Sequence, residues 1–242
     1  MKIGHVLVRG MLAGLLAAVL AFAFASIFGE PQVDNAIAVE EAGAGHDHGG
    51  EEAAVVSRGV QSTFGLAVAT GAYGLAFGGL FALAFAFAYG RVGNLSARAT
   101  AGVLGIGAFV TVFLVPFLKY PSNPPAVGQA DTINQRTTWY FVMVLISVVA
   151  AIAATVIGKR LATRLGSWNA VLAGVLGYIV VVAVAAWVLP VVNEVPDGFP
   201  ASLLWNFRVA SLGTQLILWA GIGVAFGVFI ERSVRRVAQA RA

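Results

Sequence analysis

The sequence contains no cysteine, only three histidines and few charged residues. Without cysteine, the chain can form no disulfide, thiolate metal site or cysteine nucleophile. Only 11% of its residues are charged and 59% are hydrophobic, whereas a soluble domain carries roughly 25% charged residues. The chain therefore has too few polar side chains to cover a surface that faces water, and we expect a lipid bilayer to be its solvent.

Motifs for phosphate binding and hydrolysis are also missing. The sequence has no G-x-x-x-x-G-K-[ST] phosphate loop, no G-x-S-x-G nucleophile elbow and no H-E-x-x-H zinc helix. We therefore expect no enzyme and no permanently bound cofactor. The basic residues bracket apolar runs instead of clustering on one polar face, which argues against a nucleic-acid partner.

Six stretches are long and apolar enough to cross a bilayer core of about 30 Å, which needs roughly 20 residues in a helix. They are Val6–Phe28, Phe64–Tyr89, Ala101–Leu118, Trp139–Ile157, Ala170–Leu189 and Leu212–Ile230. The sequence therefore predicts an all-α integral membrane protein with six transmembrane helices, forming a single polytopic domain over residues 1–242.

The first stretch has a second interpretation. Lys2, His5 and Arg9 precede an apolar run that ends in Ala23-Phe24-Ala25, a pattern typical of a signal peptide and its cleavage site. Cleavage would leave five helices. Signal peptides have apolar runs of about 7 to 15 residues, shorter than this one, so we expect the helix to be retained.

The distribution of charge predicts the orientation. Eleven of the fifteen Lys and Arg residues lie in the N-terminus, two short links and the tail 231–242, whereas ten of the eleven acidic residues lie in the other three connections. Because Lys and Arg are enriched on the cytoplasmic side, we expect three hairpins with long outer and short cytoplasmic connections. Both termini would then be cytoplasmic, with the protein in the plasma membrane.

The outer connections share two features. Each outgoing helix leads into a segment that contains proline: Gly29 to Pro31, Pro116 to Pro121, and Pro190 to Pro196. Because proline lacks an N–H donor, these segments predict the helix ends. An arginine precedes each returning helix: Arg58, Arg136 and Arg208. We expect these arginines to anchor the interface or to pair with nearby carboxylates. With Lys119 and Gln215, they are candidates for a shared outer mouth, as structural or pathway residues.

The acidic connection 29–60 carries the candidate metal ligands. His46, Asp47 and His48 lie among glycines, with Glu30 and Asp34 earlier in the same connection. Imidazole and carboxylate bind first-row divalent cations. We therefore consider these residues, together with Glu194, as ligands. The alternative is a solvated acidic loop in which the histidines are incidental.

Glycine pairs at four-residue spacing occur inside the apolar stretches. Gly10 and Gly14, Gly74 and Gly78, and Gly223 and Gly227 would let helices approach closely. Their predicted role is packing.

Three phrases of the sequence resemble the cobalt transporter subunit family CbtA. They are Phe28-Gly29-Glu30-Pro31-Gln32-Val33-Asp34, Pro116 through Pro125, and Asn193 through Pro200, with Leu204-Trp205 and Arg208 through Gln215 extending the third. The resemblance implies a membrane subunit for cobalt uptake, linked to cobalamin supply and working beside a small single-span partner, CbtB. It supplies no established ligand residues, so the site candidates rest on their chemistry.

Two hypotheses of function follow. The first is uptake of a divalent cation, with cobalt favoured by the resemblance alone, by a subunit that contacts lipid and a single-span partner. The second is a non-transporting scaffold or metal-sensing subunit, in which the outer charges only hold the fold. Either function is compatible with a homo-oligomer.

Overall fold

A computed structural model describes residues 3–43, 56–128 and 132–239, and this part of the chain is helical throughout its regular structure. In chain order the elements, with π-helical turns marked η, are α1 Ile3–Phe24, η1 Ala25–Gly29, α2 Glu30–Gly43, α3 Arg58–Val60, η2 Gln61–Gly65, α4 Leu66–Ala88, α5 Ala97–Ala108, η3 Phe109–Leu114, α6 Val115–Lys119, α7 Ile133–Val188 and α8 Ala201–Gln239. Helix is the expected form, because in hydrocarbon every backbone N–H and C=O needs a partner within its own segment.

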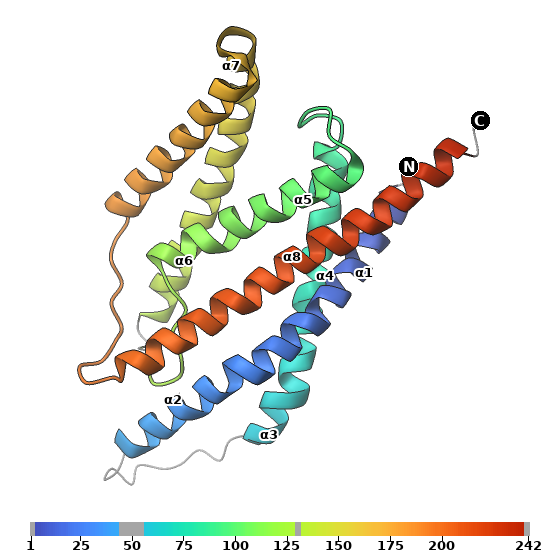
Figure 1. The fold of residues 1–242 in the computed structure, drawn as a ribbon. Coiled ribbons are helices and arrows are strands. Elements are labelled where there is room, and N and C mark those ends of the chain that lie inside the picture. Colours follow the sequence, from blue (N-terminus) through green and yellow to red (C-terminus); the bar gives the residue numbers. More distant parts are fainter. Residues whose placement is uncertain (1–2, 44–55, 129–131, 240–242) are drawn as a thin grey trace. The chain divides into compact units, whose positions relative to one another are not determined.

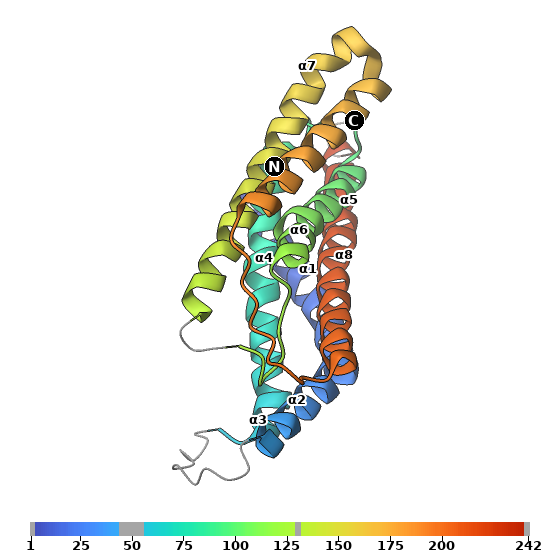
Figure 2. The same cartoon turned by 90° about the vertical axis from the view of Figure 1, so that its left-hand side faces the viewer.

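Five continuous helices in the described part are long and apolar enough to cross a membrane: Ile3–Ala42, Arg58–Ala88, Ala97–Lys119, Ile133–Val188 and Ala201–Ser233. The number differs from the six predicted stretches because two of them, 139–157 and 170–189, belong to α7. This helix has 56 residues and is broken at Gly166, whose φ of 75° and ψ of 160° are non-helical. Figures 1 and 2 show α7 as two legs that run side by side after the chain reverses.

Contacts between the legs of α7 confirm that they are antiparallel. Ser147 and Tyr178 share a hydrogen bond of 2.8 Å. Closer to the turn, a Cβ added to Gly174 would lie 3.3 Å from the carbonyl oxygen of Ala154. As the residue number rises on one leg it falls on the other. The predicted link around residues 159–164 is therefore helical, and the chain turns at Gly166.

One of the three predicted proline exits was wrong, because the helix continues past Pro31, whereas the helix that contains Pro116 ends at Lys119, within its predicted exit Pro116 through Pro121. Pro31 lies within α2 and Pro116 within α6, and each follows a π-helical turn, η1 or η3. In a regular α-helix the proline ring clashes with the carbonyl four residues earlier, and a π-helical turn just before it alters the hydrogen-bond pattern at that point. The helix therefore continues through the proline. Pro190, in contrast, follows the end of α7 at Val188.

The connection predicted as a loop over residues 29–60 is helical at both of its described ends. α1, η1 and α2 form one continuous helix as far as Gly43, and helix begins again at Arg58. At the other end of the chain, α8 continues into the basic tail as far as Gln239. Nothing in the apolar pattern indicates these extensions, since they are polar turns added to the ends of spans.

The chain divides into two compact units, of which the first comprises Met1–Ile106, Asn123–Ala126 and Gly198–Ala242. In this unit α1 packs against both α4 and α8. Gly10 faces Gly78 and Gly14 faces Gly74, so closely that a Cβ on Gly14 would lie 1.9 Å from the carbonyl oxygen of Gly74. The predicted packing role of these two glycine pairs is confirmed.

Aromatic side chains fill the space between α4 and α8. Phe226, which is fully buried, makes edge-to-face contacts with Phe81 and Phe85, and Trp219 contacts Phe77 in the same way. α5 packs on α8 through a further glycine pair, since a Cβ on Gly105 would lie 3.3 Å from the Cα of Gly223. Small residues set the close approaches, and rings fill the gaps between them.

The second unit comprises Gly107–Ser122 and Val127–Asp197. Here η3 and α6 pack against α7. The hydroxyl of Tyr140 donates to the carbonyl oxygen of Val112, at 3.3 Å. Met143 and Ser147 are buried on the first leg of α7. This packing holds the charged residues that flank α7.

Candidate functional site

Charged residues of the first unit gather where α2 and α3 begin. Arg58, the first residue of α3, binds two carboxylates of α2: its Nε donates to Asp34 Oδ1 at 2.9 Å, and its Nη2 donates to Glu30 Oε2. Glu30 and Asp34 are four residues apart and therefore lie on one face of α2. We call these three residues the α2 carboxylate cluster. The sequence left two roles open for Arg58, anchoring at the interface or pairing with a nearby carboxylate, and the structure shows the pairing.

The α2 carboxylate cluster retains acceptor capacity. Among the described residues, no hydrogen bond reaches Glu30 Oε1 or Asp34 Oδ2. The Asp34 side chain is 60% exposed, whereas that of Glu30 is 17% exposed. Two carboxylates and one guanidinium leave a formal charge of one negative unit. The cluster can therefore still attract a cation from water, with one free oxygen on each carboxylate.

A second cluster lies in the second unit, around Glu194. This carboxylate is 4% exposed. Its Oε1 accepts from the hydroxyl of Thr132, and its Oε2 accepts from Arg136 Nη1 at 3.0 Å. The other terminal nitrogen of Arg136 donates to the carbonyl oxygen of Pro121, at 3.0 Å. We call Glu194, Arg136 and Thr132 the α7 clasp, because Thr132 and Arg136 lie at the start of α7 and Glu194 lies beyond its end.

Tyr120 adds a neutral hydrogen bond within the same unit. Its hydroxyl donates to the carbonyl oxygen of Pro190, at 2.8 Å, and the residue is 3% exposed. Burial raises the pKa of this hydroxyl. The group therefore stays protonated, and remains a donor, throughout the physiological range. Lys119 lies over the Tyr120 ring, 5.8 Å from its centroid, and is held there by a cation–π contact.

Of the remaining predicted residues, Arg208 and Gln215 each lie beside a neutral polar side chain. Arg208 donates to Asn123 Oδ1 at 3.1 Å, within the first unit. Gln215 on α8 lies near the hydroxyl of Tyr73 on α4, inside the membrane span. In a span, polar side chains on neighbouring helices can satisfy one another away from water. Both contacts are typical of groups that hold helices together.

The predicted metal ligands are only partly described. His46, Asp47 and His48 lie outside the described residues. Within the described ranges no group of three or more His, Asp or Glu side chains could hold a metal ion. Glu30 and Asp34 are brought together, and Glu194 belongs to the α7 clasp in the other unit. Their role as ligands stays a prediction.

Two partners, Thr132 and Asn123, were not predicted from the sequence. Thr132 lies four residues before Arg136, so helical spacing could have placed the two side chains on one face. Asn123 had no such signal. Its contact with Arg208 joins residues 85 positions apart in the chain, and only the fold brings them together.

These features define a multi-pass α-helical membrane protein with ion pairs at the ends of its helices. Residues 3–231, nearly the whole chain, match the family described as Probable cobalt transporter subunit (CbtA). The chain belongs to this family. No curated protein and no solved structure matches it.

Proposed function

We propose that this protein is the membrane subunit of a cobalt uptake transporter in the plasma membrane. The observation that carries the proposal is the family match over residues 3–231. Cobalt is the cargo here, not a resident cofactor. The acidic connections support capture of a cation, because a surface of negative charge concentrates cations at the mouth of a pathway.

The proposed topology has six membrane crossings, two of them made by α7. A straight helix of 56 residues would extend about 84 Å at 1.5 Å per residue, far beyond a bilayer core of about 30 Å. The α7 clasp joins Thr132, before the first leg, to Glu194, after the second. Both ends of α7 therefore belong on one side of the membrane. The positive-inside bias assigns that side to the exterior and both termini to the cytoplasm.

Among the predicted ligands, the α2 carboxylate cluster is the better contact for an incoming cation. Each of its carboxylates keeps an oxygen that accepts nothing from the described residues. Cobalt binds carboxylate oxygen as well as imidazole nitrogen. We propose that Glu30 and Asp34 receive the ion after His46, Asp47 and His48 capture it.

The two steps are separable by kinetics. Replacing His46 and His48 together by Ala should raise the cobalt concentration that gives half-maximal uptake and leave the maximal rate nearly unchanged. Capture raises the local ion concentration, whereas a translocation step needs ligands on rigid elements. Initial uptake rates measured over a range of cobalt concentrations give both quantities. A loss of maximal rate in the double variant would place the translocation site in this segment.

Glu194 is assigned a structural role, because both of its oxygens are already bound. A metal ion at this carboxylate would have to displace Thr132 or Arg136. The six apolar stretches also contain no Asp, Glu or His at their centres. Ligands for an ion at mid-membrane must then come from a hydrated path or from a second subunit. This requirement supports the proposed single-span partner.

Uptake of radioactive cobalt tests the function directly. Cells that lack this protein should accumulate cobalt more slowly, and the intact gene should restore the rate. Normal accumulation without the protein would refute the proposal. Reconstitution in liposomes then separates the roles: influx with this chain alone identifies a permease, and influx only after a single-span protein is added identifies a shared pathway.

A further inference from the structure

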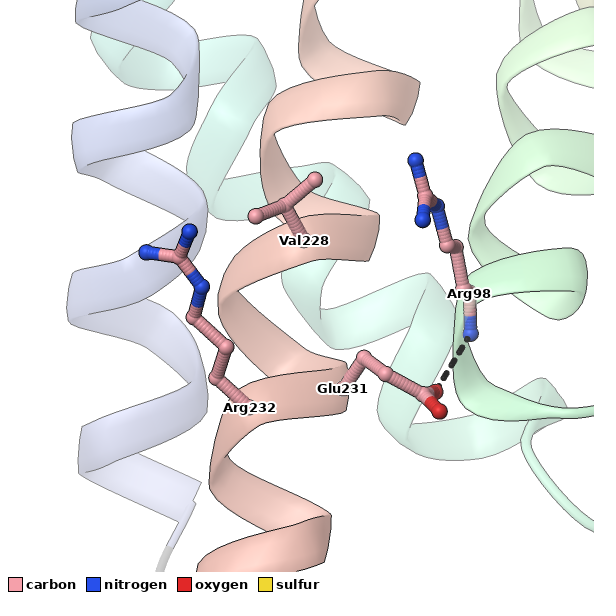
Figure 3. Close-up of a pocket in the computed structure, with 4 residues that line it drawn as sticks. All are labelled: Arg98, Val228, Glu231 and Arg232. Atoms are coloured by element: carbon pink, nitrogen blue, oxygen red, sulfur yellow. Dashed lines mark hydrogen bonds between the residues drawn. The ribbon is translucent and has the colours of Figure 1, made fainter.

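Two pockets flank α8 between Val228 and Ser233, on the side of the first unit that carries the basic residues. The first has a volume of about 350 Å³ and is lined by Arg98, Val228, Glu231 and Arg232 (Figure 3). The second, of about 250 Å³, is lined in part by Arg9, Leu12 and Phe229, and again by Arg232. The shared arginine makes them neighbours. Each combines basic side chains with an apolar wall.

The charge of the pockets is not neutralised from within. None of the ion pairs among the described residues includes Arg98 or Arg232. Glu231 is the one carboxylate that lines them, and it accepts a hydrogen bond from the backbone N–H of Arg98, at 3.4 Å. In Figure 3 this carboxylate lies at the start of α5, while the Arg98 guanidinium points away from it. The formal charge over both pockets is therefore positive.

Apolar tracks lead from both pockets along the spans. Val224, one turn before Val228 on the same face of α8, is 64% exposed. Leu12 and Leu16, on one face of α1, are 50% and 53% exposed. These side chains belong to spans that face lipid in a membrane. A ligand that fits both features has an anionic head for the arginines and apolar chains for the tracks.

We propose that these two pockets form a binding site for the phosphate headgroup of an anionic phospholipid. Guanidinium groups bind phosphate oxygens through two parallel hydrogen bonds, and basic pockets between helices on the cytoplasmic side are suited to lipid headgroups. Arg232 contributes to both pockets, Arg98 to the first and Arg9 to the second. The site is independent of cobalt and of the proposed metal pathway.

Lipid binding by the purified full-length chain tests the site. The protein in a nonionic detergent is titrated with phosphatidylglycerol, and native mass spectrometry measures the lipid bound. Wild-type protein should bind it saturably and bind phosphatidylcholine much more weakly. Arg232→Gln should weaken phosphatidylglycerol binding about fivefold or more, as expected for one basic residue at a lipid surface. Arg91→Gln is the matched control: Arg91 lies outside both pockets, and its side chain is bound to the carbonyl oxygen of Phe87.

The outcomes separate the site from its alternatives. Equal affinity in Arg232→Gln and wild type, or equal losses in Arg232→Gln and Arg91→Gln, would overturn the proposal. Inorganic phosphate that competes at concentrations comparable to the lipid's would overturn it in favour of a soluble anion. If Arg232→Gln fails to fold, Arg98→Gln and Arg9→Gln each remove one pocket's own arginine. Each should lower the affinity, and unchanged binding in both would refute the site.

Discussion

The carboxylates of this protein differ in how many of their oxygens are already hydrogen-bonded. Glu30 and Asp34 share one arginine and keep an unbound oxygen each, whereas Glu194 is buried with both oxygens bound. Residue type and position relative to the spans are alike in Glu30 and Glu194. Their partners are not, and the partners decide which carboxylate can exchange ligands with a cation.

We expect Glu30→Gln and Asp34→Asn each to lower the maximal rate of cobalt uptake several-fold at unchanged protein abundance. Each change keeps the size of the side chain and removes a carboxylate oxygen that an ion can bind. Glu40→Gln is the control, because Glu40 lies exposed on the same helix and its substitution removes the same charge. Initial uptake rates decide the matter. If all three substitutions lowered the uptake rate equally, the carboxylates would act through the overall negative potential of the surface and not as ligands.

Glu194→Gln should act on stability before it acts on transport. It leaves Arg136, which is 24% exposed, without its counter-charge, and breaking a buried pair costs about 3 kcal/mol. Thermal unfolding in detergent should show a lower midpoint than for wild type. Asp197→Asn is the matched control, since Asp197 is an exposed carboxylate in the same connection. A stable Glu194→Gln protein without uptake would instead place Glu194 in the pathway.

At the scale of elements, glycine decides how closely helices pack and where the chain turns. Gly10 and Gly14 on α1 face Gly78 and Gly74 on α4 through backbone contacts. Gly166 ends the first leg of α7 with a backbone conformation that L side chains rarely adopt. The π-helical turns η1 and η3 carry the helices through Pro31 and Pro116. These local features set the lengths and contacts of the helices.

Gly14→Ala should destabilise the α1–α4 contact. The added Cβ would lie 1.9 Å from the Gly74 carbonyl oxygen, so the backbones must separate, at a cost of about 1–3 kcal/mol for overpacking. Gly71→Ala is the control on α4, because a Cβ there meets nothing within 4 Å. Unfolding in detergent should show a loss for Gly14→Ala and no loss for Gly71→Ala. Equal stability of the two variants would mean that α1 and α4 do not pack in this way.

At the scale of the whole molecule, the number of crossings depends on α7. Ser147 bonds Tyr178 between its legs, and the α7 clasp joins its two ends. A hairpin also keeps Lys159, Arg160 and Arg164 beside the turn at Gly166, on the side to which the positive-inside bias assigns them. The chain of α7 is thus continuous, but its two legs are separate antiparallel helices.

Cysteine labelling in intact cells tests this topology without background, because the chain has no cysteine of its own. A membrane-impermeant thiol reagent should modify Asp197→Cys and should not modify Ser167→Cys until the cells are permeabilised. Both positions are exposed in the structure. Modification of Ser167→Cys from outside would show that α7 has the opposite orientation. If neither position were modified from outside, the α7 clasp would not lie on the outer side.

The membrane class, the helical fold and the pairing of Arg58 and Arg136 with carboxylates could all be predicted from sequence. Each depends on properties that act along the chain. A run of about 20 apolar residues suffices to specify a span, and charges next to its ends are drawn to one another wherever the hairpin brings them close. The glycine pairs of α1 and α4 were readable for the same reason, since their four-residue spacing places them on one helix face.

The extent of the helices and the state of each carboxylate were decided by tertiary structure. No local pattern shows that a π-helical turn will carry α1 through Pro31, or that Thr132 and Arg136 will bind both oxygens of Glu194. Glu194 and Arg136 are 58 positions apart in the sequence, and the hairpin of α7 brings them together in space. Apolar pattern is a property of consecutive residues, whereas hydrogen-bond satisfaction depends on which residues meet in space, and for this protein only the fold determines that.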